Sequence, residues 1–215
     1  FNIFNAAVHH KVRRIIFATS NHVMGGYKDD ASSGAGSVHP DSEPRVGTIP
    51  LDPKLLSTSG DAVAYGAAKL AGERLAMTLG AMHAPTTTFV CLRIGWCQPG
   101  DNLPATLTAA GSPPEFLKKG GEEQQQLPQQ SEDDKADESW FKRMWLSNRD
   151  FLSYFESALS LEVPTEMVES DGNPHRNIRK GFVLVNAMSR NNGAKWSLTE
   201  TEQVLGVTSH DDSLK

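Results

Sequence analysis

The chain has 215 residues with a formal net charge of −5, and 38% hydrophobic and 22% charged residues fit a globular protein of about one domain. No apolar run reaches the ~20 residues that cross a bilayer, and no secretory leader is recognisable, so we expect a cytoplasmic protein without a membrane partner. Because Cys91 and Cys97 make no disulfide framework and the seven histidines show no zinc-binding spacing, no metal site is expected.

The charge is concentrated in residues 101–139, which contain nine acidic residues and three lysines. The rest of the chain is nearly neutral and has no basic stripe, which argues against a nucleic-acid partner. This segment is also rich in Gly, Gln and Pro and has little aromatic content. Such a composition buries too little apolar area to offset its ordering entropy, so we predict a disordered acidic insertion between residues 1–100 and 140–215.

The first elements alternate between helix and buried strand. Helical spacing of apolar residues predicts a helix over residues 2–11, and the apolar run Ile15–Ala18 predicts a strand covered on both faces, as in a parallel sheet. Residues 28–60 show no sustained period and are expected to form a loop. A small apolar face then predicts a helix over Asp61–His83, and Thr87–Ile94 reads as the next strand.

The pattern continues after residue 140. Ser147 followed by Asp150 is a capping signature that opens a helix. Gly181–Ala187 predicts a further strand and Ser197–Leu205 a last helix. Helices alternating with buried strands indicate an α/β fold with a parallel sheet.

The most informative motif is Tyr65-Gly-Ala-Ala-Lys69, because residues i and i+4 share one helix face. A phenol has a reference pKa of about 10, and a nearby cation favours its phenolate form. Such a phenolate could take a proton from an alcohol while a hydride leaves the same carbon. Ser20 ends the preceding strand, where ligands sit in open α/β sheets, and its hydroxyl could bond the reacting oxygen. The alternative is a half-exposed helix face, because short patterns of this kind recur by chance.

The string IIFATSNHVMGGY followed by YGAAK resembles the extended short-chain dehydrogenase/reductases, the NAD-dependent epimerase/dehydratase superfamily. The Ser-Asn-His form resembles the uronate dehydrogenases, and CLRIGWCQPG, WLSNRDF and VNAMSRNNGAKWSL resemble them as well. The resemblance implies a Rossmann-like parallel sheet with flanking helices, incomplete at the N-terminus. Residues 1–100 would be the C-terminal half of an NAD-binding domain. Residues 140–215 would complete it and add a small substrate-binding region.

The resemblance also implies residue roles. Ser20, Tyr65 and Lys69 would be catalytic, and Tyr65 and Lys69 would face the cofactor together with Ile94 and Cys97.

Substrate contacts would come from Asn21, His22, Trp96 and Arg143. Trp96 stands where uronate dehydrogenases have a small residue, so we expect a reshaped pocket. Arg143 is the nearest arginine to the family's carboxylate-binding position before the W-L-S stretch.

No Gly-rich turn at a strand-to-helix junction is present to approach a pyrophosphate. We therefore expect the sequence to be a piece of a longer protein, and these 215 residues alone to bind NAD weakly or not at all. NAD is the expected cofactor, and the sequence does not distinguish it from NADP.

Three functions remain open. The first is an NAD-dependent oxidoreductase acting on a hydroxyl of a sugar or sugar acid. The second is a nucleotide-sugar epimerase or dehydratase of the same superfamily. The third is a non-catalytic Rossmann-like binding protein. The Ala-rich helix that carries Tyr65 could pack within the molecule or against a second copy in a homodimer.

Overall fold

The computed structural model describes residues 1–28, 30–46, 56–107, 132–166 and 177–215. 

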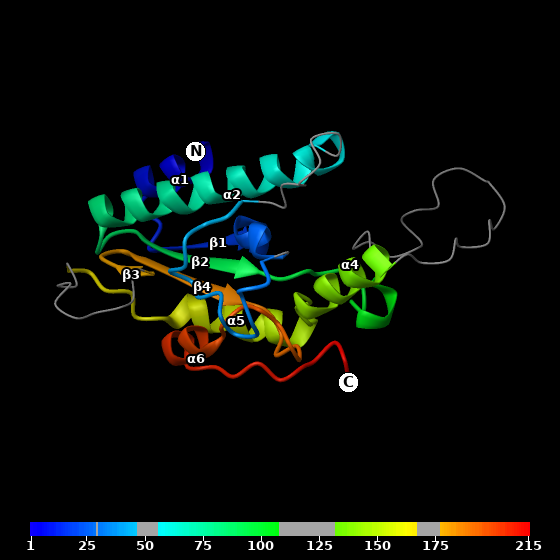
Figure 1. Cartoon of the computed structure of the whole chain (residues 1–215). Helices are drawn as coiled ribbons and strands as arrows, with labels where there is room; N and C mark the ends of the chain where they lie inside the picture. Colours follow the sequence, from blue (N-terminus) through cyan, green and yellow to red (C-terminus); the bar gives the residue numbers. More distant parts are fainter. Residues whose placement is uncertain (29, 47–55, 108–131, 167–176) are drawn as a thin grey trace.

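A four-stranded sheet with the order β1-β2-β4-β3 organises the described residues (Figure 1). β1 (Arg14–Ser20), β2 (Thr88–Ile94) and β4 (Phe182–Ala187) are parallel, and the two-residue β3 (Ile178–Arg179) is antiparallel to β4. The predicted α/β fold with a mostly parallel sheet is confirmed.

Helices cover both faces of this sheet (Figure 1). α1 (Asn2–His9) and α2 (Leu56–His83) lie on one face, and α5 (Asn148–Ser160) and α6 (Thr199–Leu205) lie on the other. No helix in the described part of the chain combines the length and apolar character needed to span a membrane.

The position of β2 between β1 and β4 explains why its apolar run shows no alternation with polar residues. Phe89 and Cys91 pack with the core cluster of α1 and α2, whereas Val90 and Leu92 pack with the cluster of α5 and α6. Successive side chains of a strand point to opposite faces, so a strand covered on both sides must be apolar at every position. The predicted strand is confirmed within one residue at its start.

Two boundaries differ from the prediction by about five residues or more. α2 begins at Leu56 rather than Asp61, because Ser, Thr and Gly in its first turns are weak helix formers that obscure the start of the helix in the sequence. α4 (Glu132–Arg143) begins inside the stretch expected to be a disordered insertion. In its last turns Lys142 Nζ contacts a carboxylate oxygen of Glu138 at 2.5 Å, a stabilising i, i+4 pair. Residues 108–131 of the expected insertion lie outside the described residues.

The capping signature at the start of α5 is confirmed. Ser147 Oγ accepts a hydrogen bond from the Asp150 backbone N–H at 3.0 Å. The buried Asp150 carboxylate in turn accepts hydrogen bonds from Ser189 Oγ at 2.6 Å and from the His210 backbone N–H at 2.9 Å. This one carboxylate therefore joins α5 to two C-terminal segments.

Candidate functional site

Ser20 is the last residue of β1 and caps the short 3-10 helix η1 (Asn21–Tyr27) that follows it. Its Oγ accepts a hydrogen bond from the His22 backbone N–H at 3.2 Å and lies 3.3 Å from His22 Nδ1. The side chain is 3% exposed. The turn therefore fixes the serine hydroxyl at the carboxyl end of the strand, where the sequence predicts it.

Tyr65 and Lys69 reach the same edge of the sheet from α2. Lys69 Nζ donates a hydrogen bond to the Ala18 carbonyl at 2.8 Å and lies 5.5 Å from the centroid of the Tyr65 ring. The Tyr65 ring meets the His22 ring edge-on with 5.5 Å between centroids, and Tyr65 remains 46% exposed. His22 therefore contacts both Ser20 and Tyr65.

Gly66 allows α2 to approach this close. A Cβ added at Gly66 would lie 2.7 Å from the His22 carbonyl oxygen and 2.9 Å from Val46 Cγ1. Any larger residue would push the helix away from η1. No local sequence pattern marks Gly66 as a contact residue, because its neighbour is a backbone atom 44 positions earlier in the chain.

A cavity of about 390 Å³ opens at this edge of the sheet. It brings together residues predicted for catalysis, for the cofactor side and for the substrate. Its described lining consists of Ser20, Asn21, His22, Tyr65, Ile94, Gly95, Trp96 and Cys97. Lys69 does not belong to this described lining. This cavity therefore brings together nearly all the predicted site residues, which come from β1, η1, α2 and the end of β2.

Trp96 is held firmly as a wall of the cavity. Its backbone N–H donates to the Met144 carbonyl at 2.8 Å, and its carbonyl accepts from the Leu146 N–H at 2.9 Å. Its ring packs edge-on against Phe141 with 5.3 Å between centroids, and its centroid lies 6.5 Å from that of His22. The indole therefore has a defined position beside the predicted catalytic residues.

Burial biases two titratable groups of the cavity wall, His22 and Cys97, toward their neutral forms. Burial lowers the pKa of His22, because the imidazolium loses hydration. Cys97 is exposed as a residue, but its Sγ is partly buried 3.8 Å from the Gly95 carbonyl, and desolvation raises the pKa of the thiol to about 11. At neutral pH neither His22 nor Cys97 therefore contributes a formal charge to the described wall.

Arg143 and Asn21, both predicted to contact the substrate, differ in their relation to the cavity. Arg143 is exposed at the end of α4, and its Nε would lie 3.2 Å from a Cβ placed on Gly193. Asn21 does line the cavity, but its Nδ2 donates to Met144 Sδ at 2.7 Å. Arg143 is absent from the described cavity lining.

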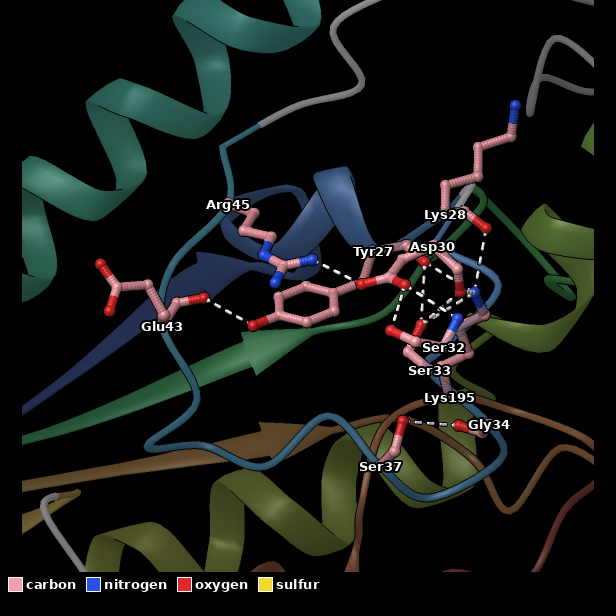
Figure 2. A network of polar contacts seen from close by, with 10 residues as sticks. All are labelled: Tyr27, Lys28, Asp30, Ser32, Ser33, Gly34, Ser37, Glu43, Arg45 and Lys195. Atoms are coloured by element: carbon pink, nitrogen blue, oxygen red, sulfur yellow. Dashed lines mark hydrogen bonds and ion pairs between the residues drawn. The ribbon is translucent and has the colours of Figure 1, made fainter.

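The segment that follows η1 is tied to the C-terminal part of the chain by Lys195, as Figure 2 shows. Lys195 Nζ donates to the backbone carbonyls of Tyr27 at 2.7 Å, Lys28 at 3.0 Å and Asp30 at 2.9 Å. It also contacts Ser33 Oγ at 3.0 Å. Because η1 carries His22, this network stabilises a segment that forms part of the cavity wall. Sequence reasoning missed Lys195, since nothing local marks a lysine whose partners are distant carbonyls.

Glu73 is a second supporting residue that the sequence analysis missed. It is 3% exposed and accepts a hydrogen bond from Thr19 Oγ1 at 2.8 Å, next to Ser20. Its carboxylate also forms an ion pair with Arg93. The sequence held a signal for this pair, because Glu73 follows Lys69 by four residues on the same helix face and Arg93 is a charged residue within a buried strand.

No protein-family model and no curated protein matches the chain. Two solved structures do: uronate dehydrogenase from Agrobacterium tumefaciens, and a mutant of that enzyme complexed with NAD. Each has a TM-score of 0.56 and 21% sequence identity, and the match covers 99% of this chain and 52% of the other. The chain therefore spans about half the length of the solved proteins it matches. At this identity the likeness shows the fold, which is Rossmann-like.

Proposed function

We propose that the chain carries the catalytic part of an oxidoreductase that oxidises a hydroxyl of a sugar or sugar acid, with NAD as the hydride acceptor. The observation that supports this most is the shared cavity of Ser20 and Tyr65, which come from separate elements. The Lys69 ammonium 5.5 Å from the Tyr65 ring adds the third member of the predicted set.

The chemistry assigned to these residues is the movement and stabilisation of one proton. Tyr65 takes the proton of the substrate hydroxyl on its phenolic oxygen, acting as general base. Ser20 Oγ donates a hydrogen bond to the substrate oxygen as the carbonyl forms, and the Lys69 ammonium favours the phenolate by Coulomb attraction. A bound nicotinamide supplies the acceptor for the hydride that leaves the same carbon.

The site fits the nicotinamide end of NAD better than its phosphates. Ile94 and Cys97 line the same cavity as Tyr65, and Lys69 Nζ lies 5.5 Å from the Tyr65 ring centroid, so these four residues would hold the nicotinamide side. The sequence contains no Gly-rich turn between a strand and a helix to contact the pyrophosphate. The same reasoning applies to NADP. We therefore expect this chain to need millimolar cofactor.

The test is NADH formation by the 215-residue chain at millimolar NAD with neutral sugars and sugar acids. Slow NADH formation that Tyr65→Phe abolishes would support the proposal. Tyr27→Phe is the matched control, since the Tyr27 hydroxyl donates to the Glu43 carbonyl and is not in the described cavity lining. Equal rates in wild type and Tyr65→Phe would contradict the proposal.

A second candidate is a non-catalytic binding protein that retains the fold. An epimerase or dehydratase of the same superfamily would use the same three residues. Analysis of sugar products separates these functions. Net NADH with an oxidised sugar supports the dehydrogenase, an altered sugar without net NADH supports the epimerase or dehydratase, and bound but unchanged sugar supports the binding protein.

A further inference from the structure

We propose that the cavity at Ser20 and Tyr65 selects an uncharged sugar over the sugar acid of the same configuration. This inference rests on the proposed function for its substrate class, and it narrows that class from sugars and sugar acids to neutral sugars. It departs from the specificity that the resemblance to uronate dehydrogenases implies.

The composition of the cavity lining supports a preference for an uncharged sugar. The eight described lining residues include no Lys, Arg, Asp or Glu, and its polar side chains are those of Ser20, Asn21, His22, Tyr65 and Cys97. A carboxylate that enters such a site loses part of its hydration and gains no cationic partner. A hydroxymethyl group in the same place can accept and donate neutral hydrogen bonds or remain in water.

Lys69 and Arg143 are the two candidate cations that the resemblance assigns to this site. Lys69 Nζ donates to the Ala18 carbonyl at 2.8 Å and lies 5.2 Å from the centroid of the Phe17 ring. Arg143 is exposed, with its guanidinium beside Gly193. Neither residue belongs to the described lining, so neither offers the bidentate contact that carboxylate recognition favours.

His22 does not replace them at neutral pH. Burial lowers the pKa of His22, and its Nδ1 lies 3.3 Å from Ser20 Oγ, which can donate to the neutral ring. Tyr65, whose ring meets the His22 ring edge-on, and Cys97, in the same described lining, carry a phenol and a thiol, which supply no positive charge. The imidazole therefore acts as a neutral hydrogen-bonding group.

Trp96 supplies the attraction for an uncharged ring. The Trp96 ring packs against the Phe141 ring with 5.3 Å between centroids, and two hydrogen bonds hold the Trp96 backbone. Little side-chain entropy is therefore lost on binding. The C–H face of a pyranose can pack on such an aromatic surface while its hydroxyls reach Ser20, Tyr65 or water. This contact depends on the apolar face of the sugar and is indifferent to a carboxylate at C6.

The experiment measures binding of matched sugars to the full chain without NAD, by ligand-observed saturation-transfer NMR. The probes are D-galactose against D-galacturonate and D-glucose against D-glucuronate, which differ only at C6. We expect the neutral member of each pair to bind roughly tenfold tighter or more, because it avoids burying an unpaired carboxylate. Equal binding, tighter uronate binding, or no binding by any probe would overturn the inference.

Variants identify the cause of the preference. Trp96→Arg places a cation in the wall and is expected to shift the binding ratio toward the uronates, whereas the control Trp140→Phe, which alters a ring packed on Trp196, is not. Arg143→Ala should leave the ratio unchanged, and selective loss of uronate binding in this variant would overturn the inference. Turnover is measured separately. A neutral-sugar preference without NADH formation contradicts only the proposed function, and NADH formed faster from uronates contradicts only the inference.

Discussion

The guanidinium of Arg93 binds both carboxylate oxygens of Glu73, with Nε 2.9 Å from Oε1 and Nη2 2.8 Å from Oε2. The two residues are 2% and 3% exposed, and Thr19 Oγ1 shares the carboxylate. The ion pair therefore joins β1 and β2 to α2 one turn beyond Lys69. Since Thr19 precedes Ser20, this contact sets the spacing between the serine and the helix that carries Tyr65.

Glu73→Gln is expected to lower the free energy of unfolding by about 3–5 kcal/mol, because it leaves the buried Arg93 charge without its anion. Urea unfolding monitored by circular dichroism measures the change. The control is Glu202→Gln, which removes an ion pair with the largely exposed Arg190 and should cost less than about 1 kcal/mol. Similar losses of unfolding free energy in both variants would contradict the larger stabilising contribution expected of the buried Arg93–Glu73 pair.

Gly66→Ala should reduce NADH formation by about tenfold or more while the chain remains folded, because its Cβ would press on the His22 carbonyl and displace Tyr65. Gly34→Ala is the matched control, since an added Cβ there meets nothing within 4 Å. Rates and circular dichroism spectra of both variants are compared with wild type. Unchanged activity in Gly66→Ala would contradict the close approach of α2 to η1.

Lys195→Met is expected to loosen the segment after η1, because three carbonyls and one hydroxyl lose a shared donor (Figure 2). Loss of these charge-assisted hydrogen bonds should cost about 1–3 kcal/mol of stability. Hydrogen exchange should accelerate at residues 27, 28 and 30–33. In Lys142→Met, which removes a single ion pair to Glu138, exchange in that region should stay at the wild-type rate. Unchanged exchange in Lys195→Met would contradict the role of Lys195.

Cys97 should react slowly with iodoacetamide at pH 8. Desolvation raises the pKa of its thiol to about 11, so roughly one molecule in a thousand carries the reactive thiolate at that pH. The rate should rise close to tenfold per pH unit and level off near pH 11. Cys97→Ser should remove the reaction, since Cys91 is fully buried. A rate that levels off near pH 8 or 9 would contradict the desolvation of this thiol.

The features that sequence could predict are those encoded by local periodicity. The apolar run of β2, the Ser147 cap of α5 and the Tyr65–Lys69 spacing each depend on neighbours within four residues. The start of α2 and the helical state of Glu132–Ser139 were harder, because weak helix formers and acidic residues also suit loops.

The remaining features depend on partners far apart in the chain. Gly66 lies against a carbonyl of η1, Lys195 binds carbonyls about 165 positions away, and Glu73 on α2 binds Arg93 on β2. Such contacts are set by tertiary packing, which leaves no short-range pattern. Arg143 was chosen by its proximity to a motif in sequence, which does not fix where a side chain lies.

The central claim is that Ser20 and Tyr65 act on the same substrate oxygen. A double-mutant cycle of kcat/KM for NADH formation, with Ser20→Ala, Tyr65→Phe and both together, tests it most directly. Each single variant should lose about 10²–10⁴ in rate, and the double variant should lose far less than the product of the two. Multiplicative losses, or single variants as active as wild type, would contradict a shared reaction centre.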